Sequence, residues 1–370
     1  MVYNDIKNIL PHFRFEGKYA DGIELTSGNI NNTYLITYDC GSERKYYTLQ
    51  HINKFVFKRP YEVMTNIEKV TKHLAAAYEK AGEDPSRRVL NLIPTTSGVY
   101  IHQDDEGHYW RAYNYINGAS AYDAPVKDAH VFETGRAFGE FQKNLADFPA
   151  EELYETIPDF HNTTRRFYTF VASVAADKAG RVKYVEDEIE FMFDHRKLMN
   201  SIVSKLNAGE LPLRVTHNDT KINNILIDNQ TDKALCVIDL DTVMPGSSLY
   251  DFGDAIRFCA STAAEDEPDT KKIHLDMNAF RLFTEGFLSE TNGFLDDDEI
   301  RALPLGVLVI TCELAMRFLT DYIDGDVYFK VRSPEHNLVR ARAQMALLTD
   351  MESKYDEMCA VIEEYITNRR

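Results

Sequence analysis

The first third of the chain alternates apolar and polar positions in short runs. β-Branched or aromatic residues recur at every second place, broken by Gly, Asn or Asp, which is typical of antiparallel strands joined by turns. The runs are "IELTSGNINNTYLITYD", "KYYTLQHIN" and "GVYIHQDDEGHYWRAYNYI". Between the second and third, "PYEVMTNIEKVTKHLAAAYEKAG" begins with Pro, ends with Gly and repeats apolar residues at helical spacing. The pattern therefore predicts a small sheet with one helix inserted.

Beyond Gly118 the pattern changes to long helical periods. Helices are expected over residues 128–145, 163–179, 185–206, 277–288, 297–320 and 337 to about 367. Two short apolar runs, "NILI" and "ALCVIDLD", interrupt these helices and predict strands. The whole pattern predicts an α+β protein, in which a small antiparallel β lobe and a short connector precede a larger, mostly helical lobe.

Composition agrees with this plan and excludes some function classes. The chain has 370 residues, of which 44% are hydrophobic and 12% aromatic, which is enough for two folded lobes. The formal net charge is -18, and no block of Lys or Arg is interleaved with aromatic residues. A nucleic-acid partner is therefore not expected, because such binding needs a basic surface.

Cysteine usage and hydropathy indicate a cytoplasmic protein. The five cysteines are scattered without C-x-x-C spacing, which favours buried, reduced thiols over disulfides or a zinc site. The start of the chain shows no signal-peptide pattern. The longest apolar run, residues 303–311, is about half as long as a membrane span requires. We therefore expect no membrane association, and no protein partner is implied.

The stretch "VTHNDTKINNILID" contains the strongest candidate for chemistry. His217, Asp219 and Asn224 form an H-x-D-x-x-x-x-N string, the spacing of a kinase catalytic loop. In such a loop one carboxylate is aimed at an acceptor hydroxyl, and an amide five residues later reaches a metal ion. Asp239 follows the apolar run "LCVI" and would complete a Mg²⁺ site that bridges the phosphates of ATP.

A literal D-F-G string at Asp251, Phe252 and Gly253 competes for the role of metal motif. No strand precedes it, and it opens an apparent helix in which Asp251 or Asp254 can cap backbone N–H groups. We therefore favour Asp239 as the metal ligand.

In the first lobe the turn "TSGNINNTY" is the candidate loop over the phosphates. It contains Gly28 with Asn29 and Asn31, residue types that tolerate positive φ. Taken alone, this turn is equally typical of an ordinary hairpin.

These motifs together resemble those of the aminoglycoside phosphotransferase and choline kinase superfamily. The strings "DLDTVMPG" and "RFLTDYIDGD" are, within it, most similar to those of the bacterial N-acetylhexosamine 1-kinases, and the likeness covers nearly the whole chain. The resemblance implies a bilobal protein-kinase-like fold. A nucleotide lobe is expected over residues 1–113, a hinge over 114–118 and a catalytic and substrate lobe over 119–370.

The resemblance also implies roles for individual residues. Asp219 would be the catalytic base, and Asn224 with Asp239 would bind Mg²⁺. ATP would be held by the turn residues Gly28, Asn29 and Asn31, by Gln50, and by the hinge residue Tyr115. The sugar or its phosphate would be contacted by Lys221, Thr242, Arg317 and Tyr328.

One position departs from the kinase pattern. Gln50 in "YYTLQHI" stands where most kinases have the lysine that pairs with the α- and β-phosphates. A neutral amide supplies no positive charge, so Mg²⁺, Lys54 or Lys58 would have to stabilise the phosphates.

The function that the resemblance implies is ATP-dependent phosphorylation of the anomeric hydroxyl of N-acetylglucosamine or N-acetylgalactosamine, giving the sugar 1-phosphate. Two alternatives stay open. The same fold could act on another alcohol, such as an aminoglycoside, choline or homoserine. The missing lysine would also suit a nucleotide-binding regulator without catalysis.

Overall fold

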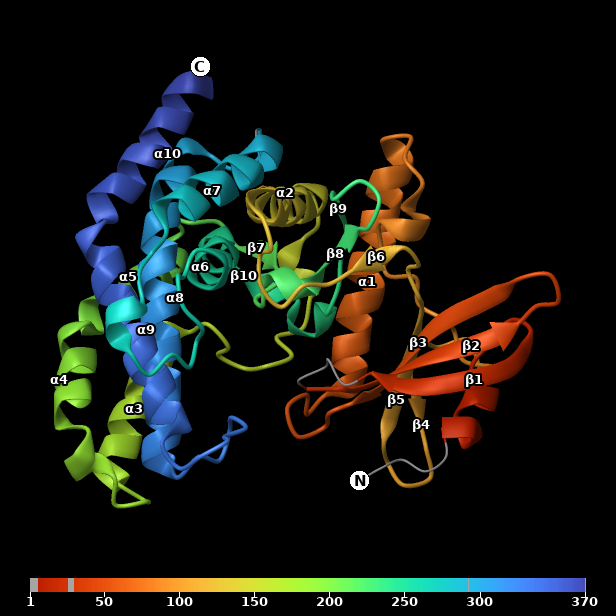
Figure 1. The fold of residues 1–370 in the computed structure, drawn as a ribbon, viewed down its shortest axis with the longest axis horizontal. Coiled ribbons are helices and arrows are strands. Elements are labelled where there is room, and N and C mark those ends of the chain that lie inside the picture. The colour runs from red at the N-terminus through yellow and green to blue at the C-terminus, as the bar shows by residue number, and fades with distance from the viewer. Residues whose placement is uncertain (1–5, 26–29, 292, 370) are drawn as a thin grey trace. The chain divides into compact units, whose positions relative to one another are not determined.

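Two compact units make up the chain (Figure 1). The structure is a computed structural model that describes residues 6–25, 30–291 and 293–369. The first unit, here called the sheet unit, comprises Met1–Ala121, Glu152–Pro158 and Ile225–Met244. The second, the helical unit, comprises Tyr122–Glu151, Asp159–Asn224 and Pro245–Arg370. The α+β class, with an antiparallel sheet in one unit and mostly helices in the other, is confirmed; the hinge over residues 114–118 stays a prediction.

The sheet unit is built on five antiparallel strands in the order β1-β2-β3-β5-β4. These strands are β1 (Lys18–Leu25), β2 (Asn32–Asp39), β3 (Arg44–Ile52), β4 (His102–Gln103) and β5 (Tyr109–Asn114). A long helix in this unit is α1 (Pro60–Lys80), with proline in its first turn as expected. A second, three-stranded sheet in the same unit is formed by β6 (Ala119–Ser120), β8 (Ile225–Asp228) and β9 (Ala234–Val237).

The alternation in the strand sequences sets the core of the sheet unit. Buried side chains from β2, β3 and β5 pack with the segment that precedes β1. This core consists of Ile9, Leu10, Phe13, Tyr34, Ile36, Tyr38, Tyr47, Leu49, Ile93, Trp110 and Ala112. In β2 the buried residues are every second one, so the pleat alone separates the core face from the other face.

The helical unit contains nearly all the remaining helices, and one short strand, β7 (Arg214–Thr216), lies within it. Strand β10 (Met244–Gly246) crosses the boundary between the units. The helices are α2 (Asp128–Asn144), α3 (Thr163–Ala176), α4 (Glu186–Asp194), α5 (Arg196–Ala208), α6 (Ser248–Cys259), α7 (Met277–Thr291), α8 (Asp297–Asp324), α9 (His336–Ser353) and α10 (Tyr355–Arg369). Figure 1 shows α6 beside α8 and α2 beside α7.

Glycines allow these two helix pairs to approach closely. A Cβ added at Gly306 of α8 would lie 2.2 Å from the Leu249 carbonyl oxygen of α6, and one at Gly253 would lie 2.4 Å from the Gly306 oxygen. The α2–α7 pair has the same device, since a Cβ at Gly135 would lie 2.2 Å from the Phe283 oxygen. Glycine is therefore required at these positions by backbone contact.

Two helices expected to be continuous are each broken in two. The helix over residues 185–206 ends at Asp194, where His195 Nδ1 lies 2.7 Å from the Phe191 carbonyl oxygen. The final helix ends at Ser353, and the Lys354 ammonium donates to the Leu275 carbonyl oxygen at 2.8 Å. In each case a side chain at the break provides a local polar contact, while the apolar periodicity continues through it.

Two observations bear on the environment of the protein. Among the described residues, α8 is the one helix long and apolar enough to cross a membrane, but 78% of its most apolar window is buried inside the fold, as in an ordinary core helix. All five cysteines are free. Three of them, Cys236, Cys259 and Cys312, are buried as expected, whereas Cys40 and Cys359 are only partly covered.

Candidate active site

The H-x-D-x-x-x-x-N motif forms a loop between β7 and a short 3-10 helix, Ile222–Asn224. Asn218 adopts φ +64°, a left-handed conformation that Asn tolerates better than most residues. Its side chain is fixed by Thr216, whose hydroxyl lies 2.9 Å from Asn218 Oδ1 and whose carbonyl oxygen accepts from Asn218 Nδ2 at 3.2 Å. These local bonds define the turn that precedes Asp219.

The first half of α6 anchors this loop. Asp251 accepts the backbone N–H groups of His217 and Asn218, at 2.9 and 2.8 Å. Asp254 accepts the backbone N–H of Thr220 at 3.0 Å. Burial raises the pKa of Asp251, and the N–H bonds from the loop and the nearby His217 oppose that rise.

The first residue of the D-F-G string therefore holds the loop that carries Asp219. The Asp251 carboxylate, 1% exposed, bonds to loop backbone and also accepts from Gln142 Nε2 at 2.8 Å. This role of the buried helix position was not foreseen from the sequence, where Asp251 was expected at most to cap its own helix.

The Asp219 carboxylate lies between two donors from its own loop. Lys221 Nζ is 2.8 Å from Oδ1, and Asn224 Nδ2 donates to Oδ2 at 2.9 Å. Burial alone would raise the pKa of Asp219, but the charge and hydrogen bond of Lys221, assisted by His217 and Asn224, hold it below its usual range. The side chain is still 25% exposed, so Asp219 is an ionised, accessible carboxylate at neutral pH.

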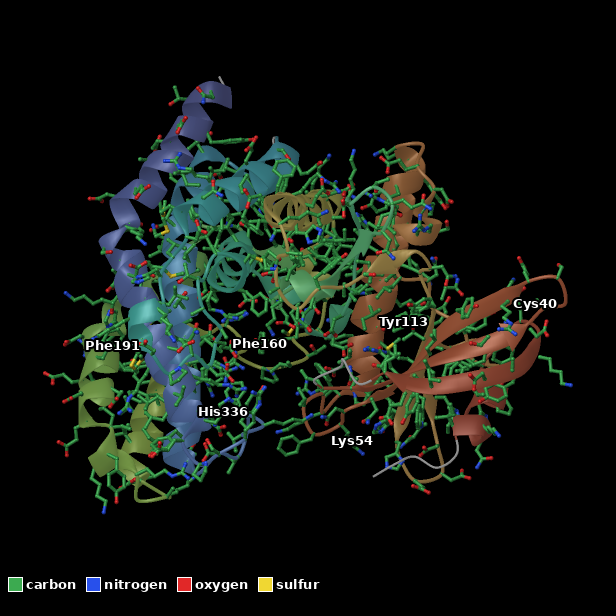
Figure 2. The ribbon with its side chains drawn as sticks, in the orientation of Figure 1. Cys40, Lys54, Tyr113, Phe160, Phe191 and His336 are labelled. Carbon is green, nitrogen blue, oxygen red and sulfur yellow. The ribbon has the colours of Figure 1, made fainter. Side chains whose placement is uncertain are left out.

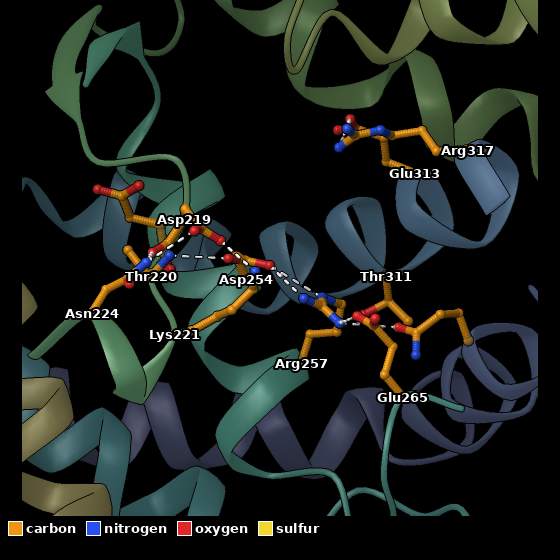
Figure 3. A network of polar contacts seen from close by, with 12 residues as sticks. Asp219, Thr220, Lys221, Asn224, Asp254, Arg257, Glu265, Thr311, Glu313 and Arg317 are labelled. Carbon is orange, nitrogen blue, oxygen red and sulfur yellow. Dashed lines mark hydrogen bonds and ion pairs between the residues drawn. The ribbon is translucent and has the colours of Figure 1, made fainter. Parts of the chain in front are cut away.

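Lys221 belongs to a chain of alternating charges that continues into α6 (Figure 3). The adjacent Asp219 carboxylate is the main cause of its raised pKa, and Asp254 adds to it. Asp254 in turn accepts from Arg257 at 2.9 Å, and Arg257 donates to Glu265 at 3.0 Å. Lys221 is therefore a permanent cation held beside Asp219.

His217 contributes to the shape of the loop. It is fully buried and lies edge-on to the rings of Phe138 and Phe141, with ring centroids 5.5 and 5.8 Å away. Its Nδ1 accepts the backbone N–H of Asp219 at 3.3 Å. The imidazole thus orients the residue that carries the carboxylate.

The predicted metal ligands offer oxygen atoms of the kind that Mg²⁺ prefers. The amide nitrogen of Asn224 donates to Asp219, so its amide oxygen is the atom that could bind a cation. Asp239 follows β9 and adopts φ +59° and ψ +56°. No group of three or more His, Cys, Asp or Glu residues suited to a metal occurs in the described parts of the chain. Binding of Mg²⁺ by Asn224 and Asp239 stays a prediction.

A buried ion pair that was not foreseen from the sequence lies in the sheet unit, two residues beyond Asp239. Arg111 on β5 binds Asp241 through both terminal nitrogens, with Nη2 2.9 Å from Oδ2, and both side chains are at most 2% exposed. The Nε of Arg111 donates to Gln50 Oε1 at 2.9 Å. Gln50 and Arg111 are paired across β3 and β5, so the register brings the position of the missing lysine next to an arginine.

Other residues predicted to contact ATP lie in the same unit. Asn31 donates to Asp241 Oδ2 at 2.6 Å and accepts the backbone N–H of Asn53 at 2.9 Å. The N–H of Tyr115 donates to the Tyr46 carbonyl oxygen at 3.0 Å. Gly28 and Asn29 lie outside the described residues. The predicted sugar contact Thr242 is buried in the 3-10 turn Leu240–Thr242.

The helical unit contains a pocket of about 240 Å³ between α3, α8 and the segment after α8. Two predicted substrate contacts, Arg317 and Tyr328, line it together. Its charged and aromatic lining consists of Arg166, Arg317, Asp321, Asp324, Tyr328 and Phe329. Arg166 was not singled out in the sequence. Burial and the nearby Arg317 lower its pKa.

Arg317 is enclosed by aromatic rings. Its guanidinium carbon lies 5.2 Å from the ring centroid of Phe160, 5.8 Å from Tyr328 and 5.6 Å from Phe329. Figure 2 labels Phe160 in the loop that precedes α3. Arg317 also lies 3.7 Å from the buried Glu313 carboxylate, so the side chain is held by packing and charge together.

Comparison with known families and structures identifies the fold and its class of enzyme. Residues 21–276 match the model of the phosphotransferase enzyme family. The chain belongs to this family. An aminoglycoside phosphotransferase from Alicyclobacillus acidocaldarius is 12% identical, with a TM-score of 0.58 and coverage of 94% of this chain and 92% of that one.

Two further solved structures share the fold. Choline kinase from Cryptosporidium parvum is 14% identical, with a TM-score of 0.55 and coverage of 94% and 93%. Spectinomycin phosphotransferase, solved with ADP and spectinomycin, is 13% identical, with a TM-score of 0.54 and coverage of 95% and 97%. At these identities the structures establish the fold, and family membership establishes a phosphotransferase.

Proposed function

We propose that this phosphotransferase moves the γ-phosphoryl group of ATP to the anomeric hydroxyl of an N-acetylhexosamine, N-acetylglucosamine or N-acetylgalactosamine, and releases the sugar 1-phosphate and ADP. The use of ATP is in keeping with the ADP bound to the spectinomycin phosphotransferase of the same fold. We place the activity in the cytoplasm, in keeping with the free cysteines.

The observation that carries the proposal is the ionised, accessible Asp219 carboxylate between Lys221 and Asn224. Phosphoryl transfer has a loose transition state, so a kinase base mainly orients the acceptor hydroxyl and takes its proton late. Asp219 would perform both tasks. Asn224 and Asp239 would hold Mg²⁺, which when bound neutralises charge on the phosphate oxygens.

The aromatic residues of the pocket argue against a quaternary ammonium acceptor. Choline is bound by aromatic rings that face its positive charge. Here the rings of Phe160, Tyr328 and Phe329 surround the protein's own guanidinium, that of Arg317. A second arginine, Arg166, lines the same pocket and would repel a cationic ligand.

The acidic residues of the pocket do not offset these arginines for a polycationic aminoglycoside. The Asp321 carboxylate accepts the backbone N–H groups of residues 327, 328 and 329, at 2.9, 2.8 and 2.9 Å. Asp324 accepts from Ser173 at 2.9 Å through Oδ2, while its buried Oδ1 has no hydrogen-bond partner in the described structure. A pocket lined by two arginines, aromatic rings and carboxylates that already bond within the fold suits a neutral sugar, which needs hydrogen-bond partners but no strong negative charge.

The test is Mg²⁺-dependent ADP release over a panel of acceptors. The panel contains N-acetylglucosamine, N-acetylgalactosamine, glucose, choline, homoserine and kanamycin, with Asp219→Asn as the inactive control. We expect turnover with the two acetamido sugars, and phosphorus NMR of the product should show a phosphate on the anomeric carbon. Turnover with only choline, homoserine or kanamycin would show that the protein is a kinase with a different acceptor from the one proposed. ATP binding without turnover on any acceptor would favour a non-catalytic regulator.

A further inference from the structure

The candidate metal ligand Asp239 adopts a backbone conformation that needs support. Its φ of +59° lies in the left-handed region, which costs energy for any residue with a side chain. Such conformations persist where the surrounding structure fixes them, and they are common at functional sites. The contacts that fix this segment should therefore matter for metal binding.

Side chains from several segments hold the residues that follow Asp239, among them Thr156, whose hydroxyl lies 3.5 Å from the Asp241 carbonyl oxygen. Arg111 and Asn31 both donate to the Asp241 carboxylate. Asn66 of α1, 1% exposed, donates to the Val243 carbonyl oxygen at 3.0 Å. The turn is thus tied to β5, to the residues before β2 and to α1, all within the sheet unit.

The same contacts show which groups bind the positively charged guanidinium of Arg111. All three nitrogens of the Arg111 guanidinium donate to protein oxygens, those of Gln50 and Asp241. The amide nitrogen of Gln50 donates a hydrogen bond to Thr33 Oγ1 at 3.1 Å. The donor groups of Gln50 and Arg111 are therefore already bonded to protein atoms, so neither side chain simply takes the place of a lysine that would bind a phosphate. The charge next to the lysine position is instead bound to the turn that carries Asp239.

We propose that Arg111 is a positioning residue for magnesium–nucleotide binding: through its two bonds to Asp241 it holds the turn that presents Asp239. This inference rests on the proposed role of Asp239 as a metal ligand. Partners that orient a metal ligand typically contribute roughly ten- to a hundredfold to metal affinity. Removal of the pair should therefore weaken the effect of Mg²⁺ on nucleotide binding.

The experiment is calorimetric titration of the 370-residue chain with the non-hydrolysable analogue AMP-PNP, with and without Mg²⁺. The measured quantity is the dissociation constant of AMP-PNP without Mg²⁺ divided by that with Mg²⁺, so a large ratio means that Mg²⁺ strengthens binding. The variant is Arg111→Met with Asp241→Asn, which removes both charges and leaves neither buried alone. We expect the Mg²⁺-dependent ratio to fall by about tenfold or more, while binding without Mg²⁺ changes less than about threefold.

A control is the ion pair Arg214–Glu299 of the helical unit, in which Glu299 is 2% exposed and Arg214 is 17% exposed. Arg214→Met with Glu299→Gln should lower the melting temperature and leave the ratio unchanged. An unchanged ratio in the Arg111 and Asp241 double variant would overturn the inference. If that variant does not fold, Arg111→Lys gives the same test, because lysine keeps the charge but loses the two-pronged contact.

Asp239→Asn separates this inference from the proposal on which it rests. If Asp239→Asn leaves the ratio unchanged, the assignment of Asp239 as metal ligand fails and the inference fails with it. If Asp239→Asn abolishes the effect of Mg²⁺ and the double variant does not, Arg111 is only a structural residue. Loss of the effect in both variants, with the control pair unaffected, supports the positioning role.

Discussion

The Asp219 carboxylate combines two requirements that usually oppose each other. A catalytic base must be ionised at working pH, yet it must lie in a partly desolvated site, which favours the neutral form. Lys221 reconciles these requirements, because its cation 2.8 Å away keeps the pKa of Asp219 low despite burial. The contact of Lys221 with substrate stays a prediction, and its contact with the Asp219 carboxylate is what the structure shows.

Replacing Asp219 by Asn should separate chemistry from nucleotide binding. The amide keeps the size of the carboxylate but accepts no proton, so we expect kcat to fall by about a hundredfold or more. The dissociation constant of AMP-PNP should stay within about twofold, because Asp219 is proposed to act on the acceptor. Steady-state ADP release and calorimetry measure the two quantities. Retained turnover would exclude Asp219 as the base.

Replacing Asp251 by Asn should loosen the catalytic loop from α6. The amide presents an N–H₂ group where the carboxylate accepts backbone N–H groups, which leaves a buried donor unsatisfied at a cost of about 1–3 kcal/mol. We expect a lower melting temperature together with a lower kcat. Asp269→Asn is the control, since Asp269 also accepts a backbone N–H, from Lys271 at 3.2 Å, but is exposed. Normal turnover in Asp251→Asn would show that the loop does not depend on this anchor.

Residues that act within one loop could be predicted from the sequence, and residues that meet across the fold could not. Asp219 and Asn224 are five positions apart, so their spacing alone implies that they are neighbours. Arg111 and Asp241 are 130 positions apart, and their pairing depends on the register of two strands and on the turn after β9. The one available signal was an arginine inside the aromatic run "HYWRAYNYI".

At the scale of elements, α6 connects the close helix contact with α8 to the loop that carries Asp219. Helix α6 carries the loop anchors Asp251 and Asp254, and its position is set by backbone contact at Gly253 and Gly306. The apolar pattern predicted α8 as a helix, but it contains no signal for such close approach. Likewise, the pattern did not show the helix breaks at His195 and Lys354, because the side-chain bonds there are independent of apolar periodicity.

Gly306→Ala tests that contact by the sign of its effect. Helix propensity alone predicts that alanine stabilises the helix by up to about 1 kcal/mol. The added Cβ would meet the Leu249 carbonyl oxygen at 2.2 Å, so we expect destabilisation and a lower melting temperature instead. Chemical denaturation of the full chain measures the change. A stabilised variant would show that the two helices separate at little cost.

At the scale of the whole molecule, the candidate residues divide between the two compact units. Asp239, Gln50, Arg111 and Asn31 belong to the sheet unit, whereas Asp219 and the pocket around Arg317 belong to the helical unit. The sequence separates Gln50 and Asn31 from Asp219, but it groups Asp239 with Asp219 in the lobe of residues 119–370, whereas Asp239 belongs to the sheet unit. It follows that nucleotide binding and acceptor binding should respond to different substitutions.

Arg317→Met tests this separation from the acceptor side. Methionine keeps much of the apolar contact with Phe160 and Phe329 but removes the charge, and a lost hydrogen bond to a charged group costs about 1.5–3 kcal/mol. We expect the KM for the acetamido sugar to rise by about tenfold or more, with the KM for ATP nearly unchanged. The control is Arg342→Met, whose half-exposed arginine pairs with Glu188 and should alter neither constant. Equal changes in both KM values would mean that Arg317 supports the fold as a whole, and the acceptor pocket would then have to be sought elsewhere in the helical unit.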